Sequence, residues 1–134
     1  MEECIFCKIA NGEVDHARIW ENEKYVAFLD VNQAVKGQAL VVPKEHLESN
    51  IYENREEDIS EAMLAAKEVA KLLQKKLNAE RVLTIIEGLE VNHLHIKLYP
   101  YKKEKDEDFP GYKFIGGKDR TPQELHEIKK EILE

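Results

Sequence analysis

The sequence has 134 residues, with 20 Lys and Arg against 27 Asp and Glu and a formal net charge of −7. This length fits one domain that can bury a hydrophobic core without disulfide bonds. Its longest apolar runs have about five residues, against the roughly 18 that a membrane-spanning helix needs, so we expect no membrane partner. The acidic composition argues against a duplex nucleic acid partner, because phosphate neutralisation needs a basic surface, but it allows a single nucleotide in a local pocket.

The N-terminal segment is acidic, reading Met1-Glu2-Glu3-Cys4. It lacks the basic region followed by a long apolar region that marks a secretory signal. We therefore expect a cytoplasmic protein in a reducing compartment, where cysteines are thiols rather than disulfides.

The first third of the chain predicts an antiparallel meander. Residues 17–30 predict a hairpin, because two short β-prone runs flank the polar stretch 21–24. Gly37 marks a turn before a strand at 38–42, which Pro43 ends. Three consecutive strands of this kind pair most simply with their neighbours in sequence.

Residues 55–78 form the clearest predicted helix, because apolar residues recur at intervals of three and four. Asn54 and Glu57 are three residues apart, which predicts an N-cap with a capping-box partner. We expect the apolar face of this helix to pack on a sheet. Its positions are Ile59, Ala62, Met63, Ala66, Val69, Ala70, Leu73 and Leu77.

Two further strands are predicted at 82–86 and 91–99, which makes five strands in all. The expected fold class is α+β, with a five-stranded antiparallel sheet and one long helix packed on it. The charged run at 102–108 is typical of a solvated loop. Thr121 and Glu124 predict a capping box for a C-terminal helix that has Pro122 in its first turn.

The most informative segment for chemistry is the predicted strand 91–99. Strand side chains alternate between faces, so His93, His95 and Lys97 share one face at steps of about 6.5 Å, while the apolar residues between them face the core. Imidazole suits nucleophilic and proton-transfer chemistry because a neutral fraction exists at physiological pH. The alternative is a polar sheet face without chemistry.

Cys4 and Cys7 form a Cys-x-x-Cys pair, which in a reducing compartment indicates a metal half-site or a redox pair. The redox interpretation expects a βαβ context that this N-terminus lacks. A zinc site needs two more ligands, which imidazoles often supply. The candidates are His16, His46, His93, His95 and His126. The alternative is a pair of buried cysteines that act as small hydrophobic residues.

Four segments in order carry a resemblance to a known family: CIFCKIANG at 4–12, YVAFLDV at 25–31, GQALVVPKEH at 37–46 and HLHI at 93–96. Together they resemble the histidine triad (HIT) family of nucleotide-binding hydrolases and transferases. The resemblance implies a HIT-like, nucleotide-binding core at 1–100, with 101–134 as a C-terminal tail and final helix in the same domain. It also implies a homodimer that joins two sheets, and cleavage of a purine nucleotide or nucleotide conjugate at its α-phosphorus.

The resemblance implies roles for individual residues. His95 matches the middle histidine, the nucleophile that forms a nucleotidyl-histidine intermediate. Asp30 matches a carboxylate that accepts hydrogen bonds from the ribose hydroxyls, and its alternative role is a turn cap before Asn32. The apolar slot for the base falls at Ile19, Trp20 and Val31, whose alternative role is core packing. The ligands of a structural Zn²⁺ match Cys4, Cys7, His46 and His93.

Two features depart from the family pattern. The third triad position, usually His or Gln, is Lys97, which can neutralise a phosphate oxygen but cannot accept a hydrogen bond. The segment at 84–91 lacks the family's Asn and Gln, keeps Gly88 as a nucleotide-binding candidate, and adds Glu87 and Glu90, whose charge repels a phosphate unless they point away.

Two hypotheses follow. The first is a nucleotidyl hydrolase or transferase in which His95 attacks the α-phosphorus and Lys97 helps to stabilise the developing charge. The second is a catalytically weak nucleotide-binding or interaction module that retains the HIT fold and a structural zinc. The two histidines favour the enzyme, and the altered loop favours the module.

Overall fold

Five strands form one sheet in a computed structural model that describes residues 4–14, 16–102 and 119–134. All four strand pairings are antiparallel, in the order β1-β2-β3-β5-β4. This confirms the predicted α+β fold with a five-stranded antiparallel sheet. The strands are β1 (Arg18–Glu21), β2 (Tyr25–Leu29), β3 (Ala39–Pro43), β4 (Arg81–Ile85) and β5 (Ile96–Tyr101).

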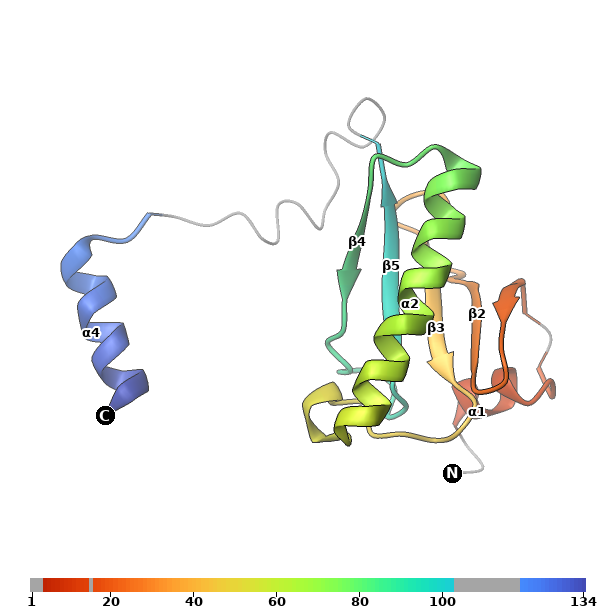
Figure 1. Cartoon of the computed structure of the whole chain (residues 1–134), viewed down its shortest axis with the longest axis horizontal. Helices are drawn as coiled ribbons and strands as arrows, with labels where there is room; N and C mark the ends of the chain where they lie inside the picture. Colours follow the sequence, from red (N-terminus) through yellow and green to blue (C-terminus); the bar gives the residue numbers. More distant parts are fainter. Residues whose placement is uncertain (1–3, 15, 103–118) are drawn as a thin grey trace.

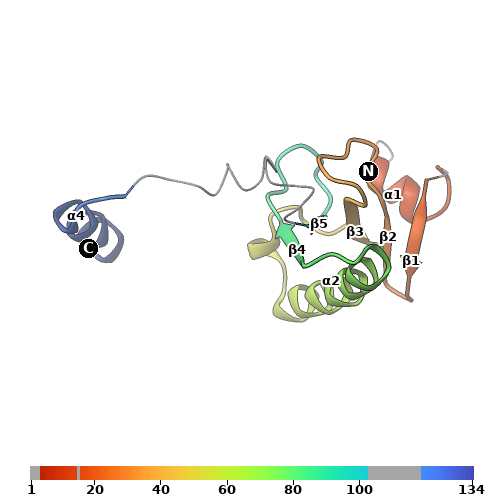
Figure 2. The same ribbon diagram turned by 90° about the horizontal axis from the view of Figure 1, so that it is seen from above.

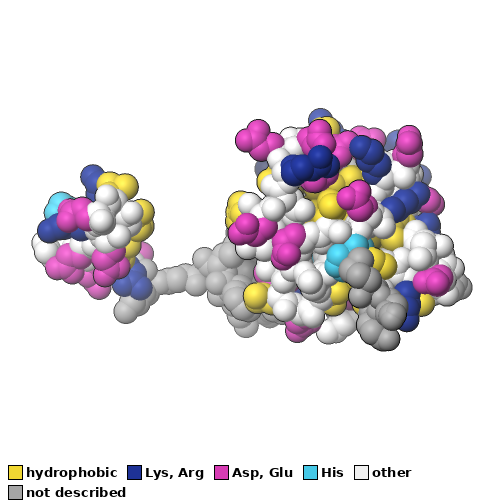
Figure 3. All heavy atoms as spheres, turned by 90° about the horizontal axis from the view of Figure 1, so that it is seen from below, with side chains coloured by type: hydrophobic (Ala, Val, Ile, Leu, Met, Phe, Trp, Pro, Cys, Tyr) yellow, Lys and Arg dark blue, Asp and Glu magenta, His cyan; other side chains and the backbone are white. Residues whose placement is uncertain are grey.

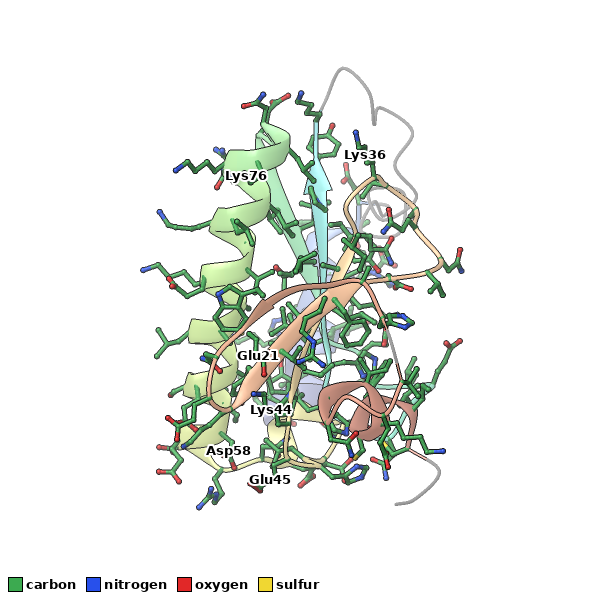
Figure 4. All side chains as sticks on the ribbon, turned by 90° about the vertical axis from the view of Figure 1, so that its right-hand side faces the viewer. Glu21, Lys36, Lys44, Glu45, Asp58 and Lys76 are labelled. Atoms are coloured by element: carbon green, nitrogen blue, oxygen red, sulfur yellow. The ribbon has the colours of Figure 1, made fainter. Side chains whose placement is uncertain are left out.

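The sheet is covered on both faces. The long helix α2 (Glu56–Leu77) lies along β3, β4 and β5 (Figure 1). The short helix α1 (Ile5–Ala10) lies on the opposite face, as the view from above shows (Figure 2). A side view shows the same three layers and, at the edge of the sheet, Glu21 beside Lys44 (Figure 4), whose ion pair measures 2.6 Å.

Alternation along β3 divides the interior into two cores. Ala39 and Val41 pack in the core beneath α2, and Leu40 and Val42 pack in the core beside α1. Because both faces are covered, every residue of this strand is buried. The strand therefore reads as a continuous apolar run rather than as alternating polar and apolar residues.

Helix α2 matches the predicted 55–78 to within one residue at each end, but its cap differs. Arg55 is the N-cap and makes no side-chain cap hydrogen bond, whereas the Asn54 side-chain amide donates to the carbonyl oxygens of Glu48 and Asn50. The predicted capping role of Asn54 is therefore wrong. The apolar face is confirmed except at Met63, which is 44% exposed.

The last strand begins later than predicted. Ladder pairing of β5 begins at Ile96, so His93 and His95 lie in the preceding loop and not in the strand. The predicted alternation persists through the loop. Leu94 and Ile96 pack in the core beneath α2, while the rings of His93 and His95 lie against Phe6 of α1 on the other face.

The C-terminal helix α4 (Pro122–Leu133) begins as predicted. Thr121 and Glu124 form the reciprocal capping box, with Pro122 in the first turn. A 3₁₀ turn at Ile51–Glu53 and helix α1 were not predicted. The predicted loop at 102–108 falls almost entirely outside the described residues, and the division into a core at 1–100 and a tail at 101–134 stays a prediction. No described helix combines the length and apolar character needed to cross a bilayer.

Candidate functional site

A cavity of about 510 Å³ opens on the face of the sheet opposite α2. Helix α1, the ends of β2 and β5 and the loop between β2 and β3 supply its walls. His95, Lys97 and Asp30, three of the residues singled out in the sequence, line it together. The fold therefore brings side chains from segments that are distant in the sequence to one concave surface.

The imidazole of His95 is held in a defined orientation. The side chain is 4% exposed, and its Nδ1 lies 2.7 Å from the carbonyl oxygen of His93. A carbonyl oxygen only accepts, so Nδ1 carries the donated proton and Nε2 of the neutral ring keeps its lone pair. Phe6 packs edge-on against this ring, with the ring centroids 5.0 Å apart. The available nitrogen is therefore Nε2.

Lys97 does not face the cavity as an isolated charge. Its Nζ donates to Glu87 Oε2 at 3.0 Å, and Glu87 Oε1 lies 3.6 Å from His95 Nε2. Burial alone would raise the pKa of Glu87, but the hydrogen bond and charge of Lys97 outweigh it and leave that pKa below its ordinary value. Glu87 is thus a carboxylate that bridges the two predicted catalytic side chains.

Asp30 lies at the cavity beside the exposed side chain of Val31. Its Oδ2 accepts a hydrogen bond from Gln38 Nε2 at 2.8 Å, and its Oδ1 accepts from the backbone N–H of Asn32 at 3.1 Å. The second contact is the turn-capping role considered for this residue. Each carboxylate oxygen can accept a further bond, so the turn contact leaves capacity for a ligand hydroxyl.

Two predicted base-binding residues lie elsewhere. Ile19 and Trp20 pack against the core beneath α2 and do not line the cavity, which corrects their expected position. The register of β1 shifts between Arg18 and Trp20, and such a bulge lets neighbouring residues share one face. Alternation alone could not reveal this.

The apolar wall comes instead from α1, through Ile5, Phe6 and Ile9. Sequence reasoning missed these residues because the short helix was not predicted. The four-residue spacing of Ile5 and Ile9 directly after Cys4 was the signal that could have found it.

Gly88 also does not line the cavity. It has a φ of +59°, and a Cβ built on it would lie 2.3 Å from the carbonyl oxygen of Ser49. The Ser49 hydroxyl donates to the Gly88 carbonyl oxygen at 3.0 Å. In this structure Gly88 allows the loop before His93 to pack against the segment that follows β3.

Four potential metal ligands meet at the end of the sheet beside α1. The donor atoms of Cys4, Cys7, His46 and His93 all lie within 4.8 Å of one another. The Nδ1 atoms of His46 and His93 are 3.3 Å apart, and Cys7 Sγ lies 3.2 Å from His46 Nδ1 and 3.4 Å from His93 Nδ1. Tetrahedral zinc geometry requires separations of about 3.4 Å between two nitrogens and about 3.6 Å between sulfur and nitrogen. The group fits a four-coordinate metal.

Hydrogen bonding prepares His93 for this role. Its Nε2 lies 2.9 Å from the carbonyl oxygen of Pro43, so Nε2 carries the proton and Nδ1 turns its lone pair to the cluster. Burial lowers the pKa of His93 to about 4, which keeps the ring neutral. Burial, together with Cys4, raises the pKa of the Cys7 thiol to about 11, so metal binding has to displace a proton there.

The cluster of four potential metal ligands is partly accessible to solvent. Seen from below, histidine side chains reach the surface beside hydrophobic ones (Figure 3). Cys4, Cys7 and His46 are half-buried, while His93 is fully buried. The donor set of two thiols and two imidazoles is one that suits zinc rather than magnesium or calcium.

A family model described as "HIT domain" matches residues 11–104. The chain belongs to the HIT family. It is 32% identical over 136 residues to "Protein hit" of Bacillus subtilis (strain 168), which covers 98% of this chain and 92% of that protein. It is 36% identical over 105 residues to the adenosine 5'-monophosphoramidase HNT1 of Saccharomyces cerevisiae, which covers 76% of this chain and 65% of that protein.

Solved structures agree with this assignment. The crystal structure of SMU.412c from Streptococcus mutans UA159 superposes on this HIT chain with a TM-score of 0.74 at 30% identity, covering 98% of this chain and 87% of that one. The resemblance predicted from four sequence motifs is therefore confirmed, and so is the HIT-like fold.

Proposed function

We propose that this HIT protein is a nucleotide hydrolase or nucleotidyltransferase that acts at the α-phosphorus of a purine nucleotide through a nucleotidyl-histidine intermediate on His95. The orientation of the buried His95 ring carries the proposal. Its Nδ1 donates to the His93 carbonyl oxygen, so the lone pair of Nε2 is left beside a cavity of about 510 Å³. The chain's similarity to a named monophosphoramidase adds support.

In the first step His95 Nε2 attacks the α-phosphorus and forms a P–N bond. The leaving group departs with the electron pair of its bond to phosphorus and takes a proton from solvent. Water or another acceptor then attacks the same phosphorus and gives its proton to solvent, the P–N bond breaks, and the imidazole recovers its lone pair. Throughout, the His93 carbonyl oxygen holds the Nδ1 proton and stabilises the positive charge that the ring carries in the intermediate.

The nucleoside would lie between α1 and the loop after β2. Asp30 has acceptor capacity for the ribose hydroxyls, and Val31 with Ile5 and Ile9 offers apolar surface to the base. Ile19 and Trp20 take no part in this proposal because they pack on the other side of the sheet.

We also propose that Cys4, Cys7, His46 and His93 hold a structural Zn²⁺. The four donors leave no open coordination position, so the metal would supply stability and not a reacting group. It would tie α1 to the segment after β3 and to the loop that carries His95. Metal analysis of protein expressed with ample zinc should find about one zinc per chain, and less than about 0.2 would contradict the proposal.

The test of the enzyme is turnover of adenosine 5'-monophosphoramidate and of diadenosine tetraphosphate. We expect wild type to cleave at least one of them and to yield a protein adduct, detectable by mass after acid-free denaturation. His95→Ala should abolish turnover and adduct while it retains nucleotide binding. His126→Ala, at an exposed position of α4, is the matched control and should keep both. Tight nucleotide binding by wild type without any turnover would eliminate the enzyme.

A second candidate is a nucleotide-binding module of weak or no activity. One observation favours it: Glu87 places a carboxylate oxygen 3.6 Å from His95 Nε2, near the space that a reacting phosphate needs. Restored turnover in Glu87→Gln, from an inactive wild type, would support this candidate. The homodimer and the cytoplasmic location stay predictions.

A further inference from the structure

Three side chains, those of His95, Glu87 and Lys97, form a row beside the cavity, and His95 and Lys97 line it. Lys97 Nζ lies 3.0 Å from Glu87 Oε2, and Glu87 Oε1 lies 3.6 Å from His95 Nε2. The side chains of Lys97 and Glu87 are 24% and 31% exposed, so solvent screens them only in part. Any phosphate that comes within bonding range of His95 Nε2 therefore also comes within a few ångströms of the Glu87 carboxylate.

The backbone next to Glu87 is held in place. Gly88 packs so closely on Ser49 that even a Cβ would meet the Ser49 carbonyl oxygen at 2.3 Å, and the Ser49 hydroxyl bonds the Gly88 carbonyl oxygen. Farther along the same loop, the backbone N–H of Leu94 donates to the carbonyl oxygen of Leu47 at 3.0 Å. The loop is thus anchored at both ends to residues 47–49, and Glu87 does not lie on a free surface segment.

The charge balance of the cavity follows from this row. Among the described residues that line it, Lys97 is the one Lys or Arg, against the carboxylates of Asp30 and Glu90. Glu87 cancels the charge of Lys97. The wall that meets the phosphate therefore offers no net positive charge to a ligand with several negative charges.

We propose that Glu87 is a specificity-determining residue that rejects nucleotides carrying negative charge beyond the α-phosphate. The accepted class is a nucleotide conjugate whose α-phosphorus bears an uncharged or cationic group. This inference rests on the proposed function, since it assigns the leaving-group preference of the same site. Lys97 holds Glu87 in position, and Glu90 adds to the same repulsion.

The experiment compares Glu87→Gln with wild type in two assays. The first is the ratio of kcat/KM for diadenosine tetraphosphate to kcat/KM for adenosine 5'-monophosphoramidate. The second is the ratio of the Kd values for ATP and AMP, which needs no turnover. Glu68→Gln is the matched control, because it removes one negative charge from the exposed face of α2, on the other side of the sheet. A cooperative thermal unfolding transition establishes that each variant is folded.

We expect Glu87→Gln to shift both ratios about tenfold toward the polyanionic ligand, as removal of one charge a few ångströms away should do. Glu68→Gln should shift neither ratio, and the wild-type discrimination should weaken between about 0.05 and 0.5 M salt, because it is electrostatic. A shift below about fivefold in both assays, or an equal shift in Glu68→Gln, overturns the proposal. If wild type turns over neither substrate, the proposed function fails, but the Kd ratios still decide the role of Glu87. Failure of wild type to bind either nucleotide overturns both.

Discussion

Gly88→Ala tests whether the loop that carries Glu87 depends on close backbone packing. The residue has a φ of +59°, and the added Cβ would lie 2.3 Å from the Ser49 carbonyl oxygen and 2.8 Å from the Ser49 carbonyl carbon. These are backbone atoms of a buried residue, so no flexible side chain can rotate away. The loop has to shift, and the Ser49 to Gly88 hydrogen bond is lost with it.

The expected cost is the sum of two effects. A left-handed backbone costs a non-glycine residue about 1–2 kcal/mol, of which about 0.4–1 kcal/mol is offset because Ala has fewer unfolded conformations. The lost hydrogen bond and the displacement of packed backbone add about 1–3 kcal/mol. The total is about 1–4.6 kcal/mol. For a chain of this length that corresponds to a fall in Tm of about 4–16 °C.

Gly12→Ala is the matched control. Gly12 also has a positive φ, of +85°, but nothing lies within 4 Å of a Cβ built there. Its substitution should cost only the net backbone contribution, about 0–1.6 kcal/mol. Thermal and urea unfolding of the two variants measure the difference directly. If Gly88→Ala destabilises the protein no more than Gly12→Ala does, the close packing of the loop on Ser49 is refuted.

Three further predictions follow. Cys4→Ser keeps an acceptor for the Cys7 backbone N–H but removes a thiolate. Bound zinc should therefore fall to near zero, and the Tm should fall by about 10 °C or more. An unchanged zinc content would exclude Cys4 as a ligand. The lowered pKa of Glu87 means that its pair with Lys97 stabilises the fold above about pH 4.3 and stops doing so as the pH falls through the folded value. The unfolding free energy of wild type should therefore exceed that of Glu87→Gln by up to about 1 kcal/mol at pH 7, and the difference should vanish near pH 3. A difference that grows on acidification would contradict the predicted direction of the pH dependence. Asp30→Asn should raise the Kd of AMP but not that of 2',3'-dideoxy-AMP, which lacks the ribose hydroxyls. An equal rise in both Kd values would show that Asp30 does not bind the ribose hydroxyls and has only its turn contact to Asn32.

Periodicity in the sequence predicted the parts of the fold that local pattern controls. Helix α2 repeats its apolar residues over 22 residues, and the capping box of α4 depends on two residues three apart. The opposite placement of Leu94 and His95 also follows from alternation, even though ladder pairing begins only at Ile96. These features need no knowledge of distant contacts.

Features that depend on distant contacts could not be predicted in this way. Helix α1 has six residues, too few to be stable without packing, and it exists because Phe6 and Ile9 bury against the sheet. The bulge in β1 turned Ile19 and Trp20 away from the cavity. The direction of Glu87 was left open by the sequence, and only its contact with Lys97 places it beside His95.

The metal cluster and the reactive imidazole share one structural support. The Nδ1 atom of His93 faces the cluster, and its Nε2–H donates a hydrogen bond to the Pro43 carbonyl oxygen. Its backbone carbonyl oxygen accepts a hydrogen bond from His95 Nδ1. The loop around it is bound to the segment after β3 by Leu94 and Leu47 as well. A metal held by His46 and His93 would join these same two segments, so it would restrain the carbonyl oxygen that orients the nucleophile. Removal of the metal should therefore lower kcat more than it raises KM for a nucleotide, because His95 loses its orientation while the wall formed by Asp30 and Val31 lies outside the cluster.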